Sequence, residues 1–175
     1  MAYRVLATTR RIAGLGFEDA GRTIAILSAL ALAGALAIEH IGGIAPCPLC
    51  LDQRIVYYAA IPLGVLAFML APGRRNWSLA VLAILAAGFV FNGGFGVYHA
   101  GIEWGWWRGP EACAGAGSLA KTPEELLKSL AQSTVVRCDE AALRIFGLSL
   151  AAYSAILSAC LAGVALLGIA DGRNR

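Results

Sequence analysis

Four long stretches of this 175-residue chain contain no Asp, Glu, Lys or Arg, and they constrain the fold more than any other feature. A helix needs about 20 mostly apolar residues to cross about 30 Å of hydrocarbon. We therefore predict an all-α integral membrane four-helix bundle that forms a single domain over residues 1–175. The expected spans are residues 23–45, 55–71, 76–99 and 145–170, with outer loops at 46–54 and 100–144.

Composition excludes several other classes of protein. Hydrophobic residues make up 59% of the chain and charged residues 14%, against about 45–50% and about 25% in soluble domains. Disordered chains are polar and rich in charge, so disorder is excluded as well. The net charge of +3 comes from scattered basic residues, unlike the basic stripe of a nucleic-acid binder. The spans also lack the short alternating pattern of a membrane β-barrel.

The positions of Lys and Arg predict the orientation of the bundle. Four spans place both termini on one side, together with the short 72–76 hairpin that contains Arg74 and Arg75. Cytoplasmic loops are enriched in Lys and Arg. We expect both termini to be cytoplasmic, and residues 39–54 and 99–144 to face the opposite compartment.

Small and polar residues within the spans predict how the helices pack. Small residues recur at every fourth position in two spans, which would let helix backbones approach closely; these positions are Ala25, Ala29, Ala33, Ala37, Ala151, Ala155, Ala159 and Gly163. Asn92 is expected to form an interhelical hydrogen bond. Cys160, in the apolar surroundings of the fourth span, is expected to be an inert thiol with a packing role.

The second outer loop contains a predicted short amphipathic helix. Thr122, Pro123 and Glu125 form a helix-start pattern of N-cap, N1 proline and N3 glutamate. Leucines follow on one face. Two locations remain open for this helix, the membrane surface and the rest of the loop.

The other four cysteines all fall in the predicted outer segments, at Cys47, Cys50, Cys113 and Cys138. Disulfides persist outside the cytoplasm, so this distribution favours redox chemistry. Cys47 and Cys50 form a C-x-x-C pair where a loop enters the second span. A helix N-terminus lowers the pKa of a nearby thiol, which favours a thiolate.

Arg54 lies four residues beyond Cys50, on the same helical face. Its charge would stabilise a thiolate or a reduced anionic cofactor, although an interfacial arginine reaching for lipid head groups is the structural alternative. A C-x-x-C pair alone is either a redox centre or half of a zinc site. A zinc site would need Cys113 and Cys138 as its other two thiolates.

Together, these features resemble the DsbB family, whose members are quinone-linked disulfide-generating proteins of the bacterial inner membrane. The resemblance rests on four spans, the C-x-x-C pair with its arginine in the first outer loop, and a second cysteine pair in the second outer loop. Segments 98–113 and 138–140 also match a branch of the family. The vitamin K epoxide reductase family has its C-x-x-C after the loop pair, so the order seen here favours DsbB.

The resemblance implies a thiol:quinone oxidoreductase, with ubiquinone preferred to menaquinone. Cys47 and Cys50 would pass electrons to the quinone, with Cys50 nearest the ring and Arg54 in the quinone site. Cys113 and Cys138 would oxidise a periplasmic thioredoxin-like (DsbA-like) partner. In that scheme Cys113 forms the mixed disulfide with the partner, and Cys138 exchanges with Cys47.

His40 and His99 lie near the outer ends of their spans. Histidine suits proton transfer near neutral pH, so both are candidates for the quinone site, with a role-free interfacial position as the alternative. Two outer histidines also permit a bis-His haem b electron carrier, and four thiolates permit a zinc-binding membrane protein. No metal is expected in the oxidase, and Trp104, Trp106 and Trp107 are expected to form an interfacial aromatic belt.

Overall fold

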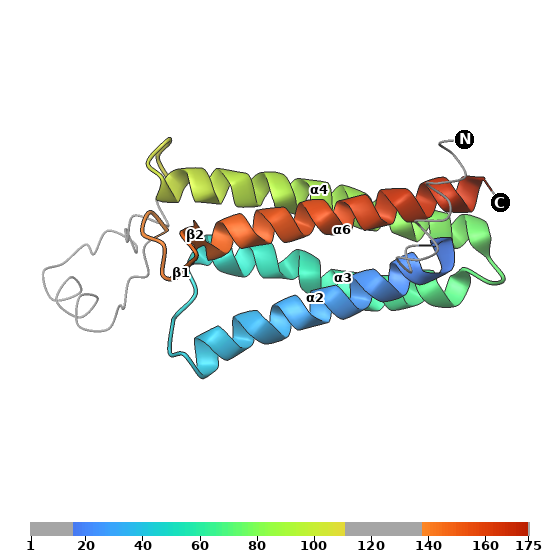
Figure 1. The fold of residues 1–175 in the computed structure, drawn as a ribbon, viewed down its shortest axis with the longest axis horizontal. Helices are drawn as coiled ribbons and strands as arrows, with labels where there is room; N and C mark the ends of the chain where they lie inside the picture. Colours follow the sequence, from blue (N-terminus) through green and yellow to red (C-terminus); the bar gives the residue numbers. More distant parts are fainter. Residues whose placement is uncertain (1–15, 111–137, 175) are drawn as a thin grey trace, which may run out of the picture.

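The computed structural model describes residues 16–110 and 138–174. This part of the chain forms four long helices: α2 (Phe17–His40), α3 (Pro48–Leu70), α4 (Arg75–Glu103) and α6 (Leu150–Arg173) (Figure 1). All four are long and apolar enough to cross a membrane. The predicted four-helix membrane bundle is confirmed. The predicted amphipathic helix around Thr122 lies outside the described residues.

Two of the helices begin earlier in the sequence than the charge pattern suggests. Helix α2 starts at Phe17, where Glu18 and Asp19 occupy its first turn and favour a helix N-terminus through its partial positive charge. Helix α3 starts at Pro48, an N1 proline whose fixed φ suits that position. Most of the predicted 46–54 loop is therefore helical. Asp52 lies exposed on α3, and Arg54 is partly buried there.

The ends of the predicted spans differ as well. Helix α2 stops at His40, and the chain then passes through Gly43, which has a positive φ of 67°. Helix α4 continues to Glu103, past the predicted end at residue 99. A small antiparallel hairpin of β1 (Arg144–Ile145) and β2 (Leu148–Ser149) precedes α6, where the sequence predicted the start of the fourth span.

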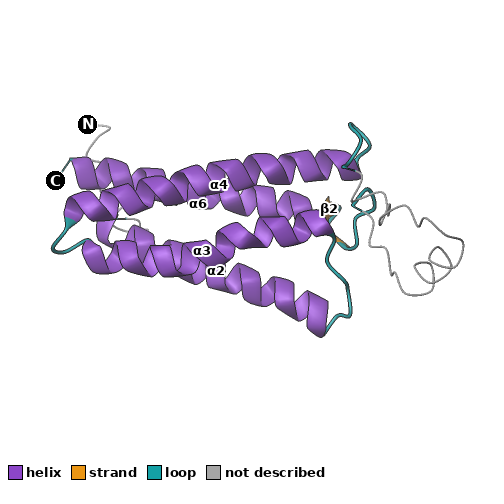
Figure 2. Ribbon diagram, turned by 180° about the vertical axis from the view of Figure 1, so that it is seen from behind, coloured by secondary structure: helices purple, strands orange, loops and turns teal. Residues whose placement is uncertain are grey.

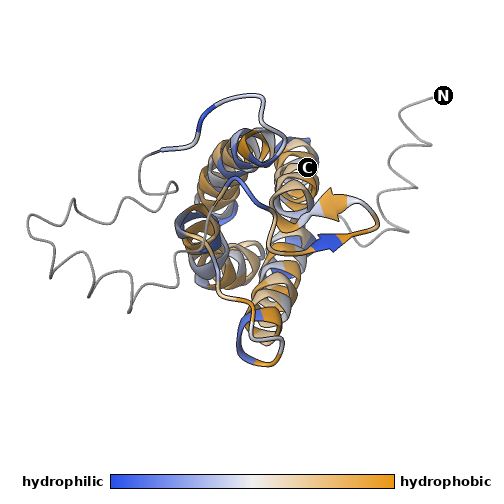
Figure 3. Cartoon of the chain, turned by 90° about the vertical axis from the view of Figure 1, so that its left-hand side faces the viewer, coloured by the Kyte–Doolittle hydropathy of each residue, from blue (hydrophilic) through white to orange (hydrophobic). Residues whose placement is uncertain are grey.

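The four helices run side by side, with the starts of α2 and α4 and the end of α6 at the same end of the bundle (Figures 1 and 2). At that end α2 lies close to α3, and toward His40 the two helices diverge (Figure 1). The helices are coloured mostly as apolar in Figure 3, and many of their large apolar side chains are exposed. Phe91 is 72% exposed and Met69 70% exposed, as suits side chains that face lipid.

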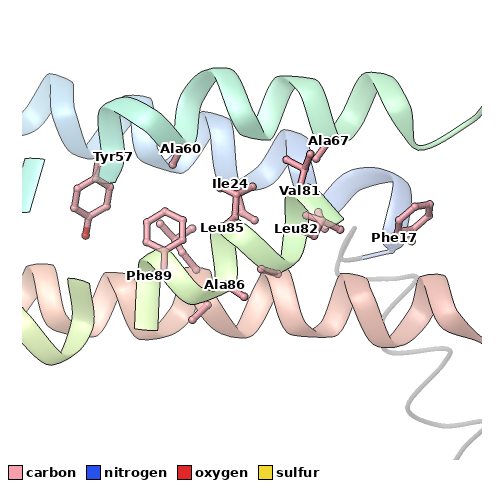
Figure 4. Packing of buried hydrophobic residues seen from close by; sticks show 14 of the residues in the cluster. Phe17, Ile24, Tyr57, Ala60, Ala67, Val81, Leu82, Leu85, Ala86 and Phe89 are labelled. Carbon is pink, nitrogen blue, oxygen red and sulfur yellow. The ribbon is translucent and has the colours of Figure 1, made fainter. Parts of the chain in front are cut away.

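The main core lies between the helices and is built from large apolar side chains and alanines. Ile24, Leu82, Phe89 and Leu161 are completely or almost completely buried there (Figure 4 shows the first three). The ring of Tyr57 lies 5.8 Å from that of Phe89, at the edge of this core.

Small residues bring two helix pairs into close contact. A Cβ atom on Gly64 would lie 2.7 Å from the carbonyl oxygen of Gly21 and 3.1 Å from Cβ of Ala25. A Cβ atom on Gly96 would lie 3.0 Å from that of Ala155. The predicted role of small residues is thus confirmed at Ala25 and Ala155.

The prediction is wrong for the later part of the α2 stripe. Ala29, Ala33 and Ala37 are exposed, whereas Ser28 and Leu32 on the same stretch of α2 are buried. A stripe of period four rotates by about 40° at each step around a helix of 3.6 residues per turn, and so leaves the buried face. Cys160 is a free thiol exposed on the outside of α6, within the apolar span where the sequence places it.

The predicted interhelical bond of Asn92 is confirmed. Its amide nitrogen donates to the hydroxyl oxygen of Ser158 at 3.0 Å, and the hydroxyl of Tyr57 lies 3.0 Å from the same oxygen. A polar network therefore links α3, α4 and α6, which limits sliding of these helices against one another.

Candidate redox site

The C-x-x-C pair forms the first turn of α3. Cys47 is the N-cap residue, and its sulfur accepts a hydrogen bond from the backbone N–H of Cys50 at 3.2 Å. A side chain at this position satisfies one of the backbone donors that every helix N-terminus leaves free. The local sequence therefore holds both sulfurs at the same end of the helix.

Cys47 and Cys50 are both free thiols. The side-chain hydrogen bond with Cys50, followed by burial, raises the pKa of Cys47 well above its ordinary range. Cys47 therefore keeps its proton at neutral pH, and the reactive thiolate of the pair is not formed there.

His99 of α4 lies directly against this pair. Its Nε2 atom is 3.6 Å from the sulfur of Cys47, and its Nδ1 atom is 2.8 Å from Nε2 of Gln53. His99 is 1% exposed and Gln53 4% exposed. Since Gln53 donates to Nδ1, the other ring nitrogen carries the proton and points it toward Cys47.

Glu103 lies one turn beyond His99 on α4. Its Oε1 atom is 3.9 Å from Nε2 of His99, and its side chain is only 6% exposed. Its Oε2 atom has no hydrogen-bond partner among the described residues. The redox site thus includes a buried carboxyl group.

Arg54 forms an ion pair with Glu39 of α2. Both side chains are mostly buried, at 15% and 27% exposed. The guanidinium therefore connects α2 to α3 inside the protein, and this contact argues against a purely lipid-facing arginine.

His40 is not brought to the site. It is exposed at the end of α2, and its Nδ1 atom lies 3.1 Å from the carbonyl oxygen of Leu36 in the same helix. A pair of haem-ligating histidines is therefore not assembled from His40 and His99 in this structure.

A cavity of about 320 Å³ opens beside the C-x-x-C pair. Helices α2 and α6 supply most of its apolar wall, with Leu30, Ile38 and Leu157 among the residues. Its polar lining includes residues of the redox site on α3 and α4, namely Cys50, Gln53, Arg54, His99 and Glu103. The sulfurs of Cys47 and Cys50 therefore lie at the edge of a mostly apolar cavity.

Comparison with known proteins assigns the family. The family model for disulfide bond formation protein DsbB matches residues 20–168. The chain belongs to the DsbB family. It is therefore a multi-pass inner-membrane protein of disulfide bond formation, with a redox role.

Individual relatives agree with this assignment. A probable disulfide formation protein of Deinococcus radiodurans is 35% identical over 81% of this chain and 86% of its own. Disulfide bond formation protein B 1 of Pseudomonas putida is 31% identical over 82% and 84%. An uncharacterised protein of Rickettsia prowazekii, RP370, is 25% identical over 77% of each chain. No solved structure matches the chain.

Of the second cysteine pair, only Cys138 is among the described residues. It is buried in a small hydrophobic cluster with Cys47, Leu49 and Ile102, and it is disulfide-bonded. The structure thus places Cys138 beside the DsbB C-x-x-C pair, whereas Cys113 lies outside the described residues. A cysteine in a disulfide is not a thiolate ligand, so a four-thiolate zinc site is not formed here.

The sequence predictions missed Gln53 and Glu103, and they did not identify Glu39 as the partner of Arg54. Gln53 lies three residues beyond Cys50, and Glu103 four residues beyond His99, so each shares a helical face with a known candidate. That spacing is the signal that would have found them. The three tryptophans lie partly exposed after α4, and their role as a membrane belt remains a prediction.

Proposed function

We propose that this DsbB-family protein is a thiol:quinone oxidoreductase that reoxidises a periplasmic thioredoxin-like partner. The observation that carries the proposal is a pair of free thiols, Cys47 and Cys50, at the edge of an apolar cavity that Arg54 and His99 also line. The same apolar cavity is thus lined by the thiols, which can donate electrons, by the positively charged Arg54 and by the protonated ring nitrogen of His99.

The cavity suits the ring of a quinone. Ligand pockets are mostly apolar with a few polar groups, and they measure about 300–1,000 Å³; this cavity of about 320 Å³ has that character. Cys50, Arg54 and His99 would hold the ring, and His40 would not. A bound quinone supplies an acceptor for two electrons and two protons, with ubiquinone proposed in preference to menaquinone.

The cysteines would work in two exchange steps. One thiolate of the reduced partner attacks Cys113 and breaks the proposed Cys113–Cys138 disulfide. The second partner thiol then attacks the mixed disulfide, and the partner leaves oxidised. Cys113 and Cys138 remain as two thiols, so two electrons and two protons have been transferred to this pair.

The second step would return the loop pair to its oxidised form. The thiolate of Cys138 attacks the sulfur of Cys47 in an oxidised Cys47–Cys50 pair, and Cys50 leaves as a thiolate. Cys113 then attacks Cys138, re-forms the loop disulfide and releases Cys47. The burial of Cys138 and Cys47 in one cluster supports this route.

The neighbouring residues would then control protons and charge. Cys47 retains its proton because its pKa is raised, so the thiolate facing the cavity belongs to Cys50. The N–H of His99 toward Cys47 would stabilise that sulfur when it leaves. Arg54 would stabilise negative charge beside Cys50.

The test is anaerobic mixing of the purified protein with a reduced thioredoxin-like partner and a soluble quinone. We expect quinol to form as the partner is oxidised, and Cys50→Ser to abolish both signals. Cys160→Ser is the matched control, because Cys160 is a free thiol exposed on α6 away from the site. Undiminished quinol formation by Cys50→Ser would refute the assignment. Running ubiquinone and menaquinone analogues in parallel tests the quinone preference.

A further inference from the structure

We propose that the reduced site also binds one Zn²⁺ ion, through Cys47, Cys50, His99 and Glu103, and that the ion inhibits the enzyme. Zinc binding itself needs only the dithiol, whereas the inhibition rests on the proposed oxidase function. Zinc would be a regulator of the site, distinct from a resident cofactor.

The first three ligand atoms already have the spacing of a metal site. The sulfurs of Cys47 and Cys50 and a ring nitrogen of His99 all lie within 4.8 Å of one another. Tetrahedral zinc with bonds of about 2.3 Å to sulfur and about 2.0 Å to nitrogen separates those two ligands by about 3.6 Å. The distance from the Cys47 sulfur to Nε2 of His99 is 3.6 Å.

Glu103 is the candidate for a fourth ligand, although it lies outside the group of three ligand atoms that are within 4.8 Å of one another. Its Oε1 atom lies 3.9 Å from Nε2 of His99, against about 3.4 Å between oxygen and nitrogen ligands of tetrahedral zinc, so the carboxyl group would have to move toward the sulfurs to complete the site. Its Oε2 atom is buried without a hydrogen-bond partner among the described residues. Burial of an unpaired polar atom is costly, and a bound cation would offset that cost.

Gln53 suits the histidine form that zinc requires. A metal on Nε2 leaves the proton on Nδ1, which then donates to a neighbouring acceptor. Gln53 already contacts Nδ1 at 2.8 Å, and its own Oε1 atom has no partner in the described part of the chain. A half-turn of the amide presents that oxygen to Nδ1–H.

The proton balance makes the site depend on its redox state. Zinc binds thiolates, so its binding displaces the proton that Cys47 holds, and that of Cys50 wherever Cys50 is protonated, with no change of oxidation state. Once the two sulfurs share a disulfide bond, neither is a thiolate ligand. Zinc would therefore hold the pair reduced and keep it from passing electrons on.

The test uses Co²⁺ as a spectroscopic probe and Zn²⁺ as its competitor, with the full-length protein in detergent. We expect one Co²⁺ per reduced chain, with a sulfur-to-cobalt charge-transfer band that zinc removes. The protein with oxidised Cys47 and Cys50 should bind none. Cys50→Ser should lose most of the band, and Cys160→Ser should keep it.

Glu103→Gln separates a four-ligand site from a three-ligand site. Loss of outer-shell partners alone weakens metal binding by about 10- to 100-fold, so loss of a ligand should weaken it by at least about tenfold. The absence of a charge-transfer band in the reduced protein, or an equal band in Cys50→Ser, would overturn the proposed site. If Glu103→Gln binds Co²⁺ with unchanged affinity, Glu103 is not a ligand of the metal.

Quinol formation distinguishes inhibition from binding. The assay uses Cys160→Ser, which keeps the redox site and lacks the exposed thiol on α6. We expect Zn²⁺, at the concentration that saturates the site, to stop quinol formation by this variant, and a chelator to restore it. If the metal binds and quinol formation continues, the proposal that zinc inhibits the enzyme is overturned. If no quinol forms even without zinc, the oxidase proposal fails, while the cobalt spectra still decide the metal site.

Discussion

Removal of the hydrogen bond between Gln53 and His99 tests whether Gln53 holds the proton of His99 on the ring nitrogen that faces Cys47. The length of this hydrogen bond is 2.8 Å, and both side chains are almost completely buried. Gln53→Met keeps an unbranched side chain of similar length and removes the amide. Nδ1 of His99 then loses its donor inside the protein, at a cost of about 1–3 kcal/mol.

The expected effect on catalysis follows from the position of the proton on the ring. Without the amide of Gln53, His99 loses the group that keeps a proton on Nε2, which faces Cys47. If the full cost falls on release of the Cys47 sulfur, the turnover number drops by about 5- to 150-fold, since about 1.4 kcal/mol corresponds to a tenfold change in rate.

The assay is anaerobic quinol formation at saturating reduced partner, compared with Ser78→Ala. The hydroxyl of Ser78 donates to the carbonyl oxygen of Ala67 at 2.8 Å, another buried hydrogen bond but one that lies outside the cavity. We expect the control to lose stability without losing rate. A Gln53→Met protein with unchanged turnover, or a control slowed equally, would refute the proposed role of Gln53.

Other consequences of the structure can be measured separately. Gly64→Leu should destabilise the detergent-solubilised protein by about 1–3 kcal/mol through overpacking, whereas Gly94→Leu, at a position with no neighbour within 4 Å, should leave its thermal unfolding unchanged. Arg54→Gln should raise the KM for quinone in steady-state kinetics, because it removes the positive charge at the cavity and leaves Glu39 without its ion-pair partner; an unchanged KM would place Arg54 outside the quinone site. Gly73→Cys, in the α3–α4 connection, should take up more of a membrane-impermeant thiol reagent than the unsubstituted protein only in inverted vesicles; extra label over the unsubstituted protein in right-side-out vesicles would reverse the proposed orientation.

The membrane spans could be predicted because the thickness of a bilayer sets a minimum length for an apolar helix, and the length of an apolar segment can be counted in the sequence. Their exact ends could not, because charged residues need not lie in loops. Arg54 sits inside α3 and satisfies its charge with Glu39 across a helix interface. The sequence gives no direct sign of that partnership, since the two residues belong to different elements.

The sequence predicted a cofactor role for both His40 and His99. The structure brings only His99 to the cavity, and helix geometry explains why His40 is left outside. Glu39 and His40 are consecutive on α2, so their side chains point in directions about 100° apart. Glu39 pairs with Arg54, and His40 is therefore turned outward. Gln53 and Glu103 required the tertiary structure, because a polar residue in a span is recognised as part of a site only when its burial and neighbours are known.

The cavity itself follows from how α2 is attached to α3. Near the start of α2, Gly21 and Gly64 let the two backbones touch, and at its far end the Glu39–Arg54 ion pair joins the helices again. The helices diverge from the start of α2 toward its far end, where the two side chains of the ion pair span the distance between them. The cavity on that side is lined by apolar residues of α2 and α6. The two attachments therefore have different consequences: a bulky residue at Gly64 changes how the helices pack, whereas loss of Arg54 changes both the outer attachment and the charge beside Cys50. A quinone affinity that responds to Arg54→Gln and not to mild packing changes at Gly64 would locate the binding determinant at the outer, charged end of the cavity.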